Sequence, residues 1–453
     1  MSRLLFECTN VFRSPGVNSG IQRVVRNIVR QLDNVSGDIE CVPVLFAHNR
    51  LYRVRQLLPG DEGKTLPARA YAWLERLNQA FWRLHGRYEQ HWPMCRWHNA
   101  RRVFFVLWRL LGLPLAVAMR VLRLLGYDPL QQRAEPFEAQ PGDQLVLLDS
   151  SWHAQHFAQI EGLKRRGVGV IAVIYDLIPV VRPEFFEERL RGVFNMWFDW
   201  VVHQADGYMS ISQSVSEQVS EEITRRLGRE AAAERWYGYF HLGSELDLRD
   251  EAGTPTADLI DLFDSNRQVF LAVSTIEPRK NHAYLLDAFE LAWAEGSQAC
   301  LCIVGRVGWK CEALIKRIRE HEEFGLRLFM FNDVDDNGLE IAYSKAAALV
   351  FSSHAEGFGL PLVEAMQRGL PAMGSDLPVF REIGGEFMAY FDLDRPASLA
   401  ELVQRFEVSG QFPAACALSG WRWIDWRESA GQLIEGVEAG IAAGRAGQHA
   451  RSA

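Results

Sequence analysis

The segment from Leu349 to Gly369 constrains the fold of this chain more than any other part of the sequence. It begins with a short apolar run, passes through a turn that contains Gly357 and Gly359, and continues with the spacing of apolar residues typical of a helix. In open α/β sheets, ligands bind at the carboxyl ends of strands, where backbone N–H groups and a helix N-terminus favour negative charge. The segment therefore predicts an α/β domain with a site for an anionic ligand.

The chain has 453 residues, which is too long for one ordinary domain. Short apolar runs alternate with amphipathic stretches in both halves, as parallel sheets require. We expect strands at 144–148, 168–175, 269–273, 300–304 and 349–352, and a helix at 281–294. A polar stretch separates the two series. The expected organisation is an N-terminal domain 1–245, a linker 246–266, a C-terminal domain 267–439 and a disordered polar tail 440–453.

Charge and cysteine content exclude several classes of protein. The net charge is −8, which argues against general nucleic-acid binding. The seven cysteines contain no CxxC pair and no zinc-ligand spacing, so neither a disulfide framework nor a zinc site is expected. Glu7 and Asn10 interrupt the N-terminal apolar stretch, which is too short for a signal peptide. A cytoplasmic location is the expectation.

Residues 64–126 reverse the overall charge. They contain eleven Lys or Arg, two acidic residues and five of the fourteen tryptophans, which gives this insert a charge of +9 and leaves −17 elsewhere. Val103–Leu125 is apolar enough to suggest a membrane span, but three arginines and Pro114 interrupt it. The pattern favours a helix lying in a membrane interface. The alternative is a helical insert packed on its own domain.

Two carboxylates in the first segment are candidate ligands for sugar hydroxyls. Glu356 lies in the glycine turn, and Glu364 follows eight residues later in the first turns of the expected helix. The alternative is that Glu356 caps the helix and Glu364 is a solvated surface residue.

Two adjacent cations, Arg279 and Lys280, follow the expected strand at 269–273. A guanidinium binds phosphate bidentately and an ammonium binds it as a point charge, so together they can neutralise a diphosphate. A solvated pair is the alternative.

The run EGFGLP-x-x-EAM, which begins at Glu356, resembles the E-x7-E signature of glycosyltransferase family 4, a group of retaining enzymes that use nucleotide sugars. The resemblance covers roughly residues 10–48 and 144–435 and leaves the insert unmatched. It implies an α/β protein of the GT-B fold, with two Rossmann-like domains facing across a cleft. The first domain, with its helical basic and aromatic insert, would bind the acceptor, and the second would bind the nucleotide sugar.

Two further stretches are similar to phosphate-binding motifs of this family. The run EPRKN has Lys280 in the lysine position of the family's phosphate-binding stretch and Thr275 where many members have arginine, so Arg279 is expected to substitute in charge. We associate this run with O-antigen mannosyl- and rhamnosyltransferases. The loop that leads into Gly20 and Arg23 resembles the family's first loop, which implies that both residues approach the donor diphosphate. Taken alone, such a loop is more often ordinary turn chemistry.

Two other stretches are similar to known motifs, but we do not transfer the usual role of either motif. The run VIYDLIP resembles the family's HDLIP stretch, with Tyr175 in place of the histidine and Asp176 retained. We do not transfer a proton-shuttle role to Tyr175, and Asp176 alternatively caps the segment that follows. The run Asp333-Val334-Asp335 matches the DxD metal motif of another glycosyltransferase fold. The resemblance instead implies that this loop lies near the nucleotide base, with no metal required.

The resemblance implies retaining transfer of a hexose, with mannose from GDP-mannose as the expected donor group. The acceptor would be a lipid-linked oligosaccharide or a surface polysaccharide, and residues 64–126 would hold the enzyme against the inner face of the plasma membrane. No cofactor, metal or nucleic acid is expected. The implied catalytic residues are Glu356, Arg279, Lys280 and Asp176, and the implied donor-binding residues are Glu364, Gly357, Phe358, Gly359, Gly20, Arg23 and Val334. A non-catalytic GT-B scaffold and a UDP-sugar epimerase remain alternatives.

Overall fold

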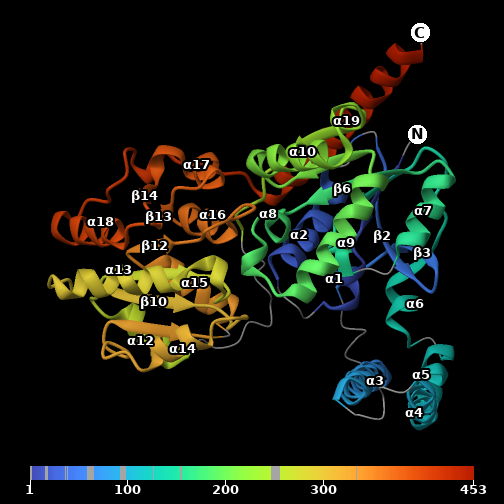
Figure 1. The fold of residues 1–453 in the computed structure, drawn as a ribbon, viewed down its shortest axis with the longest axis horizontal. Coiled ribbons are helices and arrows are strands. Elements are labelled where there is room, and N and C mark those ends of the chain that lie inside the picture. The colour runs from blue at the N-terminus through green and yellow to red at the C-terminus, as the bar shows by residue number, and fades with distance from the viewer. Residues whose placement is uncertain are drawn as a thin grey trace.

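The computed structural model of the chain contains two α/β domains that lie side by side (Figure 1). It describes residues 3–15, 19–35, 37, 39–58, 66–91, 98–125, 127–153, 156–245, 256–332 and 334–452. Most of the expected linker, at 246–255, and parts of the insert lie outside this description.

The first domain is built on an eight-stranded sheet. Six neighbouring strands in it, β2, β1, β5, β6, β7 and β8, are parallel. Across the sheet the strands are β4 (Ala134–Phe137), β3 (Arg50–Val54), β2 (Cys41–Ala47), β1 (Leu4–Glu7), β5 (Gln144–Leu147), β6 (Gly169–Ile174), β7 (Gly207–Ser210) and β8 (Trp236–Tyr239). Its helices include α1 (Thr9–Arg13), α2 (Gly20–Val35), α6 (Pro129–Arg133), α7 (Phe157–Arg165), α8 (Ile178–Val181), α9 (Glu188–Gln204), α10 (Gln213–Leu227) and α11 (Arg229–Ala232). Alternate residues of β1 point to opposite layers: Leu4 packs in the core with α2, and Leu5 packs in the core with α7.

The second domain is built on a six-stranded, fully parallel sheet. Across the sheet the strands are β11 (Leu328–Phe331), β10 (Cys300–Val304), β9 (Val269–Val273), β12 (Ala348–Phe351), β13 (Ala372–Ser375) and β14 (Ala389–Phe391). Its helices are α12 (Ala257–Asp264), α13 (His282–Ala294), α14 (Glu312–Arg319), α15 (Asp336–Lys345), α16 (Leu360–Gln367), α17 (Pro378–Gly384) and α18 (Pro396–Ser409). Renumbered within the domain, the strand order is that of a Rossmann fold, with the switch between β9 and β12.

The expected strands agree with β5, β6, β9, β10 and β12 to within two residues at either end. The expected helix at 281–294 begins one residue later, at His282. The reason is that Asn281 has a left-handed backbone, with φ of 52°, which a helical residue does not adopt.

The expected domain boundaries need two corrections. Helix α12 lies within the stretch expected as a linker and packs against α15 of the second domain. Helix α19 (Trp426–Ser452) leaves the second domain and packs on α2 and β8 of the first, so residues 426–439 belong spatially to the first domain. The indole N–H of Trp426 donates to the Glu245 carbonyl at 3.0 Å and fixes the start of this helix.

The expectation of a disordered tail after residue 440 is also wrong, because α19 continues to Ser452. Three of its glycines, Gly436, Gly440 and Gly444, lie on the contact face at intervals of four residues. A Cβ at Gly436 would lie 2.6 Å from Met209, and a Cβ at Gly440 would lie 2.3 Å from the Trp236 ring. The small residues that suggested disorder therefore let the helix approach β7 and β8 closely.

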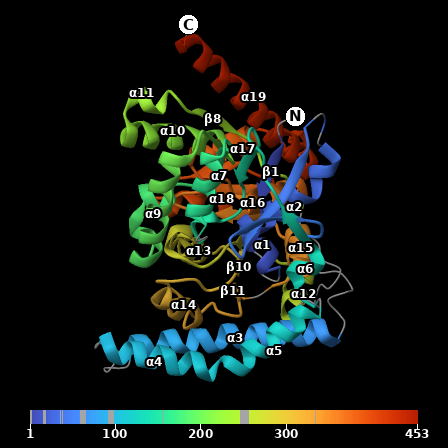
Figure 2. The same cartoon turned by 90° about the vertical axis from the view of Figure 1, so that its right-hand side faces the viewer.

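The insert forms three helices, α3 (Leu66–His91), α4 (His98–Leu111) and α5 (Leu113–Leu124), that connect β3 to β4 and lie beyond the body of the protein (Figures 1 and 2). The single helix suggested by Val103–Leu125 is divided at Gly112, where the axis bends by 50°. Over the described residues, no single helix is both long enough and apolar enough to span a membrane. Among them, only the bent pair of 102–111 and 113–124, taken together, has the required length and apolarity.

Replacement of Trp426 by alanine is expected to lower the free energy of unfolding of the first domain by about 3 to 5 kcal/mol, because a large buried side chain and its hydrogen bond are lost. Urea denaturation followed by circular dichroism measures this change. Val408→Ala is the matched control, because Val408 is 90% exposed. Equal midpoints for the two variants would show that α19 contributes little to the first domain.

Candidate active site at the domain interface

The switch point of the second sheet brings together residues that are far apart in the sequence. The loop after β9 contains Arg279 and Lys280, and the loop after β12 contains Glu356. Since β9 and β12 are neighbours, their carboxyl ends meet at one edge of the sheet. The backbone N–H of His354 also donates to the Arg279 carbonyl at 2.9 Å and joins the two loops. These three predicted site residues therefore lie together, at the place where open α/β sheets bind ligands.

The Glu356 carboxylate is held between the two cations. Its Oε1 lies 2.5 Å from Lys280 Nζ, and its Oε2 lies 2.8 Å from Arg279 Nη1. The Ser353 hydroxyl also donates to Oε1, at 2.5 Å. All three charged side chains expose less than a fifth of their surface. In this conformation, Glu356 occupies the side of the cations that an anionic ligand would use.

A second carboxylate, Glu277, completes the site and was not predicted from the sequence. It is buried, and it accepts hydrogen bonds from Arg279 Nε at 3.0 Å and Nη2 at 2.9 Å. Arg279 Nη1 also donates to the Ala355 carbonyl at 2.8 Å. Glu277 therefore fixes the guanidinium plane. Its position two residues before Arg279 was the only available signal, and that spacing alone does not predict a contact.

The charges of the site shift one another's pKa values. Burial raises the pKa of Glu356, but Arg279 and Lys280 outweigh burial and hold it at about 2. Burial lowers the pKa of Lys280, and the charge of Arg279 lowers it further. Burial also acts against the charge of Arg279, but Glu356, Glu277 and Asp176 raise its pKa above the ordinary value. Glu356 is therefore ionised at neutral pH.

Asp176 comes to this cluster from the first domain, where it follows β6. Its carboxylate accepts the N–H of Ile178, the first residue of α8, at 3.0 Å. Burial raises the pKa of Asp176, while the nearby charge of Arg279 lowers it. Its neighbour Tyr175 is buried and donates its hydroxyl to the Leu148 carbonyl at 2.7 Å, inside the first domain. Tyr175 therefore does not present its hydroxyl to the cations.

Glu364 is the centre of a separate contact between the domains. It is buried on α16 and forms an ion pair with Arg23 of α2, and it accepts the Tyr343 hydroxyl at 2.9 Å. Gly20 lies beside the start of α16, where a Cβ would be 3.8 Å from Leu360. The start of α2 and helix α16 therefore lie together across the interface. Glu364 is not a solvated surface residue, and its partner here is Arg23.

The residues of the glycine turn have different roles. A Cβ at Gly357 would lie 2.1 Å from the Tyr175 carbonyl, so only glycine fits against the first domain. Gly359 has φ of 110°, which favours glycine, and directly precedes α16. Phe358 was expected to bind the donor, but its ring is buried against Trp423 and His241, with centroids 5.9 and 6.3 Å away. Its side chain belongs to the packing between domains.

The predicted nucleotide loop lies at the carboxyl end of β11, two strands away from β9. Val334 is partly buried and packs against the core, and Asp333 lies outside the described residues. The Asp335 carboxylate accepts the N–H of Gly338 at 2.8 Å as the N-cap of α15. Among the described residues, no group of three or more metal-ligating side chains is gathered in one place.

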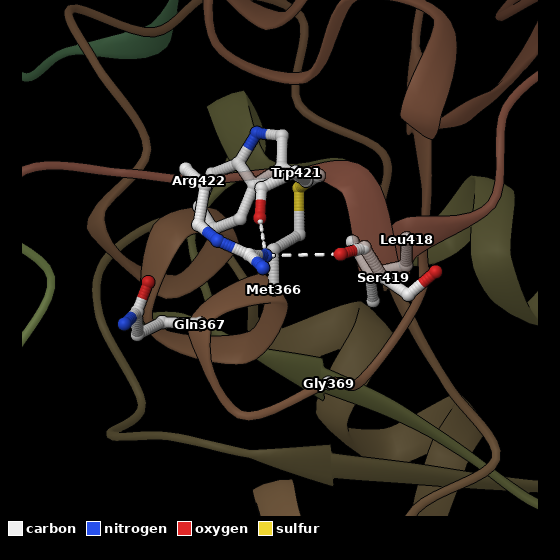
Figure 3. Close-up of a pocket in the computed structure, with 7 residues that line it drawn as sticks. All are labelled: Met366, Gln367, Gly369, Leu418, Ser419, Trp421 and Arg422. Carbon is white, nitrogen blue, oxygen red and sulfur yellow. Dashed lines mark hydrogen bonds between the residues drawn. The ribbon is translucent and has the colours of Figure 1, made fainter.

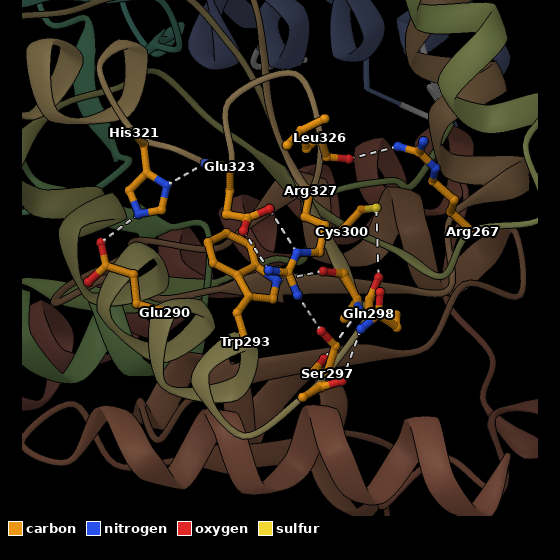
Figure 4. A network of polar contacts seen from close by, with 12 residues as sticks. Arg267, Glu290, Trp293, Ser297, Gln298, Cys300, His321, Glu323, Leu326 and Arg327 are labelled. Atoms are coloured by element: carbon orange, nitrogen blue, oxygen red, sulfur yellow. Dashed lines mark hydrogen bonds and ion pairs between the residues drawn. The ribbon is translucent and has the colours of Figure 1, made fainter.

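Three cavities lie away from the ion cluster. One of 410 Å³ lies behind α16, where Arg422 donates to the Ser419 and Trp421 carbonyls (Figure 3). A second, of 860 Å³, lies at the opposite edge of the second sheet, beside the network in which Glu323 pairs with Arg327 (Figure 4). A third, of 480 Å³, adjoins β11 and α12. None of these three cavities is lined by Arg279, Lys280 or Glu356, because the two domains meet at the cluster.

Comparison with known proteins supplies the family and fold. Residues 259–417 match the family described as Glycosyl transferases group 1. The chain is 33% identical over 323 residues to the serotype-specific mannosyltransferase WbdA of Escherichia coli, covering 67% of this chain and 38% of that protein. It is 32% identical over 139 residues to the O-antigen chain mannosyltransferase RfbU of Salmonella typhimurium, covering 30% of this chain and 38% of that protein. The chain thus spans 38% of the length of both relatives.

Two solved structures have a similar fold. Anabaena HepE, in complex with UDP and glucose, aligns with a TM-score of 0.51 at 16% identity, over 96% of this chain and 95% of that chain. Sucrose-phosphate synthase from Thermosynechococcus elongatus aligns with a TM-score of 0.52 at 16% identity, over 100% of both chains. The predicted GT-B fold is confirmed.

The low pKa of Glu356 predicts a specific loss of stability in acid. A carboxylate whose pKa is lowered by folding stabilises the protein above its unfolded pKa and loses that contribution as pH falls. Between pH 5 and pH 3, the wild-type free energy of unfolding should therefore fall by about 2 kcal/mol more than that of Glu356→Gln. Urea midpoints measured across this range test the difference. Exposed Glu320→Gln is the control and should follow the wild type; parallel curves for wild type and Glu356→Gln would contradict the assignment.

Proposed function

Because this chain belongs to the group 1 glycosyl transferases, we propose that it transfers a hexose from a nucleoside-diphosphate sugar to an acceptor hydroxyl with retention of anomeric configuration. The observation that carries this proposal is the cluster of Arg279, Lys280 and Glu356 at the switch point of the second domain, beside Asp176 of the first. Such a cluster suits a ligand that has both a diphosphate and a sugar.

The diphosphate of the donor would replace the Glu356 carboxylate beside Arg279 and Lys280. The bond between the sugar carbon and the phosphate oxygen breaks, and a bond to the acceptor oxygen forms on the same face. The leaving phosphate oxygen accepts the acceptor's proton, while the two cations stabilise the growing negative charge. Once displaced, Glu356 is free to orient the sugar hydroxyls. Asp176 faces the same cations and would help to keep them in position.

Donor binding requires the domains to separate at α16. The Arg23 and Glu364 ion pair crosses the interface. In the proposed complex, Glu364 would bind the ribose hydroxyls of the donor. Arg23 must release it before the ribose can bind, and Arg23 is then available to the diphosphate. Opening and closing of this kind is common in enzymes that bind substrate between domains.

The donor we propose is GDP-mannose, since WbdA and RfbU are named mannosyltransferases. The acceptor we propose is a lipid-linked oligosaccharide or a surface polysaccharide, because RfbU is named for the O-antigen chain. The enzyme would work on the cytoplasmic side of the plasma membrane, held there through residues 64–126. It would need no metal or cofactor, because Arg279 and Lys280 supply the positive charge that a divalent ion would otherwise provide.

Turnover of GDP-mannose tests the activity and the residue roles together. Lys280→Ala should lower kcat by about 10²- to 10³-fold, because one charge partner of the transition state is lost. Glu356→Gln should mainly lower kcat, whereas Glu364→Gln should mainly raise the KM for the donor. Lys316→Ala, on the exposed face of α14, is the control.

Release of GDP that depends on a polyprenyl-linked acceptor would support the transferase. Binding of nucleotide sugar without turnover would support the scaffold instead, and conversion of the sugar without an acceptor would support the epimerase. Wild-type kinetics in both glutamate variants would refute their assigned roles.

The donor base is open to a direct binding test. A ligand that binds only the folded protein stabilises it by RT ln(1 + L/Kd), where L is the free ligand concentration, and so raises the midpoint of thermal unfolding. We expect GDP-mannose to stabilise the protein by about 2.7 kcal/mol at a concentration one hundred times its Kd. UDP-, dTDP- and ADP-sugars at the same concentration should stabilise it less. A larger shift with any of those three would overturn the choice of GDP-mannose.

A further inference from the structure

Exposed apolar side chains are concentrated in one part of the molecule. Of the 25 large apolar side chains that are exposed among the described residues, 17 lie in the helices of the insert or directly after them. A monomeric protein in water rarely leaves so large an apolar surface uncovered. A partner with apolar chemistry is therefore expected for this region.

The helices α4 and α5 arrange part of this surface as a stripe. Its members follow one another at intervals of three or four residues, which is the spacing of one helix face, and this spacing continues across the bend at Gly112. Each member leaves at least half of its surface exposed. They are Val103, Val106, Leu110, Leu113, Val117, Val121 and Leu124.

The stripe is not the face on which the insert folds. Helix α3 packs against other side chains of this pair: Phe81 stacks on Trp108 with ring centroids 4.8 Å apart, and His85 stacks on Phe104 at 5.1 Å. Phe81 also lies so close to Gly112 that a Cβ there would be 2.9 Å away. The insert therefore has an aromatic core of its own, and the stripe is left for an external partner.

The charge of the insert decides between possible partners. Helices α4 and α5 contain no acidic residue, and Arg102, Arg109 and Arg120 are exposed beside the stripe. A second copy of the chain would bring one insert of charge +9 against another. An anionic lipid surface instead provides acyl chains for the stripe and phosphate headgroups for the arginines.

We infer that the α4–α5 stripe is the membrane-binding face of this protein, and that its partner is an anionic lipid bilayer. The pair lies in the plane of the interface, with the stripe toward the acyl chains and Arg102, Arg109 and Arg120 among the headgroups. Helix α3 packs against the other side chains of the pair and supports it. This inference rests on the membrane partner included in the proposed function and specifies the face and the lipid.

Flotation of the full chain with vesicles tests this face. The wild type should float with vesicles of phosphatidylethanolamine and phosphatidylglycerol, and it should stay behind with phosphatidylcholine alone. The triple variant Val106→Glu, Leu110→Glu and Val117→Glu should lose vesicle binding. The matched control carries Met196→Glu, Leu291→Glu and Val408→Glu, three exposed apolar positions outside the insert, and should float like the wild type. Thermal midpoints verify that both variants are folded.

The triple variant Arg102→Gln, Arg109→Gln and Arg120→Gln tests the arginines separately. It should bind the anionic vesicles about a hundredfold more weakly, because each basic residue near such a surface contributes about 1 kcal/mol. Flotation of the stripe variant at the wild-type level would overturn the inference. So would a wild type that fails to float but forms a dimer which the stripe variant lacks, because a second copy would then cover the face.

Activity is measured in the same samples with a donor and a detergent-solubilised acceptor. Vesicle binding without turnover would count against the transferase and leave the membrane face intact. Turnover with the detergent-solubilised acceptor but without vesicle binding would support the transferase and count against the membrane face.

Discussion

The site depends on the mutual neutralisation of charges that have been taken out of water. Arg279 touches Glu277 and Glu356, Lys280 touches Glu356, and the charge of Asp176 acts on both cations from the other domain. Removing one member of a buried ion pair is costly because its partner remains buried without compensation. A ligand that displaces Glu356 must therefore bring negative charge of its own. This requirement selects for phosphate groups and disfavours neutral sugars as ligands of the cations.

Polar contacts also hold the two domains together next to this cluster. Glu382 of the second domain accepts hydrogen bonds from the first two N–H groups of α10 in the first, and its carboxylate lies 2.7 Å from His241. The Ser212 hydroxyl, which caps the same helix, also donates to the Gly357 carbonyl at 2.8 Å. The glycine turn and the helix N-terminus are thus linked across the interface. Polar contacts of this kind can be exchanged for water at modest cost, which would suit the opening of the interface that we propose for donor binding.

The sequence predicts the parts of this structure that local pattern determines. The apolar runs predict β9, β10 and β12, and the order of strand and loop then brings Arg279, Lys280 and Glu356 to one edge. Contacts that depend on tertiary placement are not predicted. The glycines of α19 are typical of a polar tail until the Trp236 ring of β8 lies against them. Nothing near Phe358 in the sequence indicates that its ring packs on Trp423 and His241. Glu277 is similar, since its role appears only when Arg279 turns back toward it.

The distribution of charge connects the insert with the active site. The insert carries +9 and the rest of the chain −17, so an anionic surface attracts one part of the molecule and repels the other. Because charges in physiological salt are screened beyond about 8 Å, only the part of the protein nearest the membrane feels this attraction. The helices of the insert extend from the edge of the first domain, between β3 and β4, and lie beyond the body of the protein (Figure 2). A molecule bound through them would therefore hold its first domain at the membrane, where the proposed acceptor with a lipid anchor would be confined.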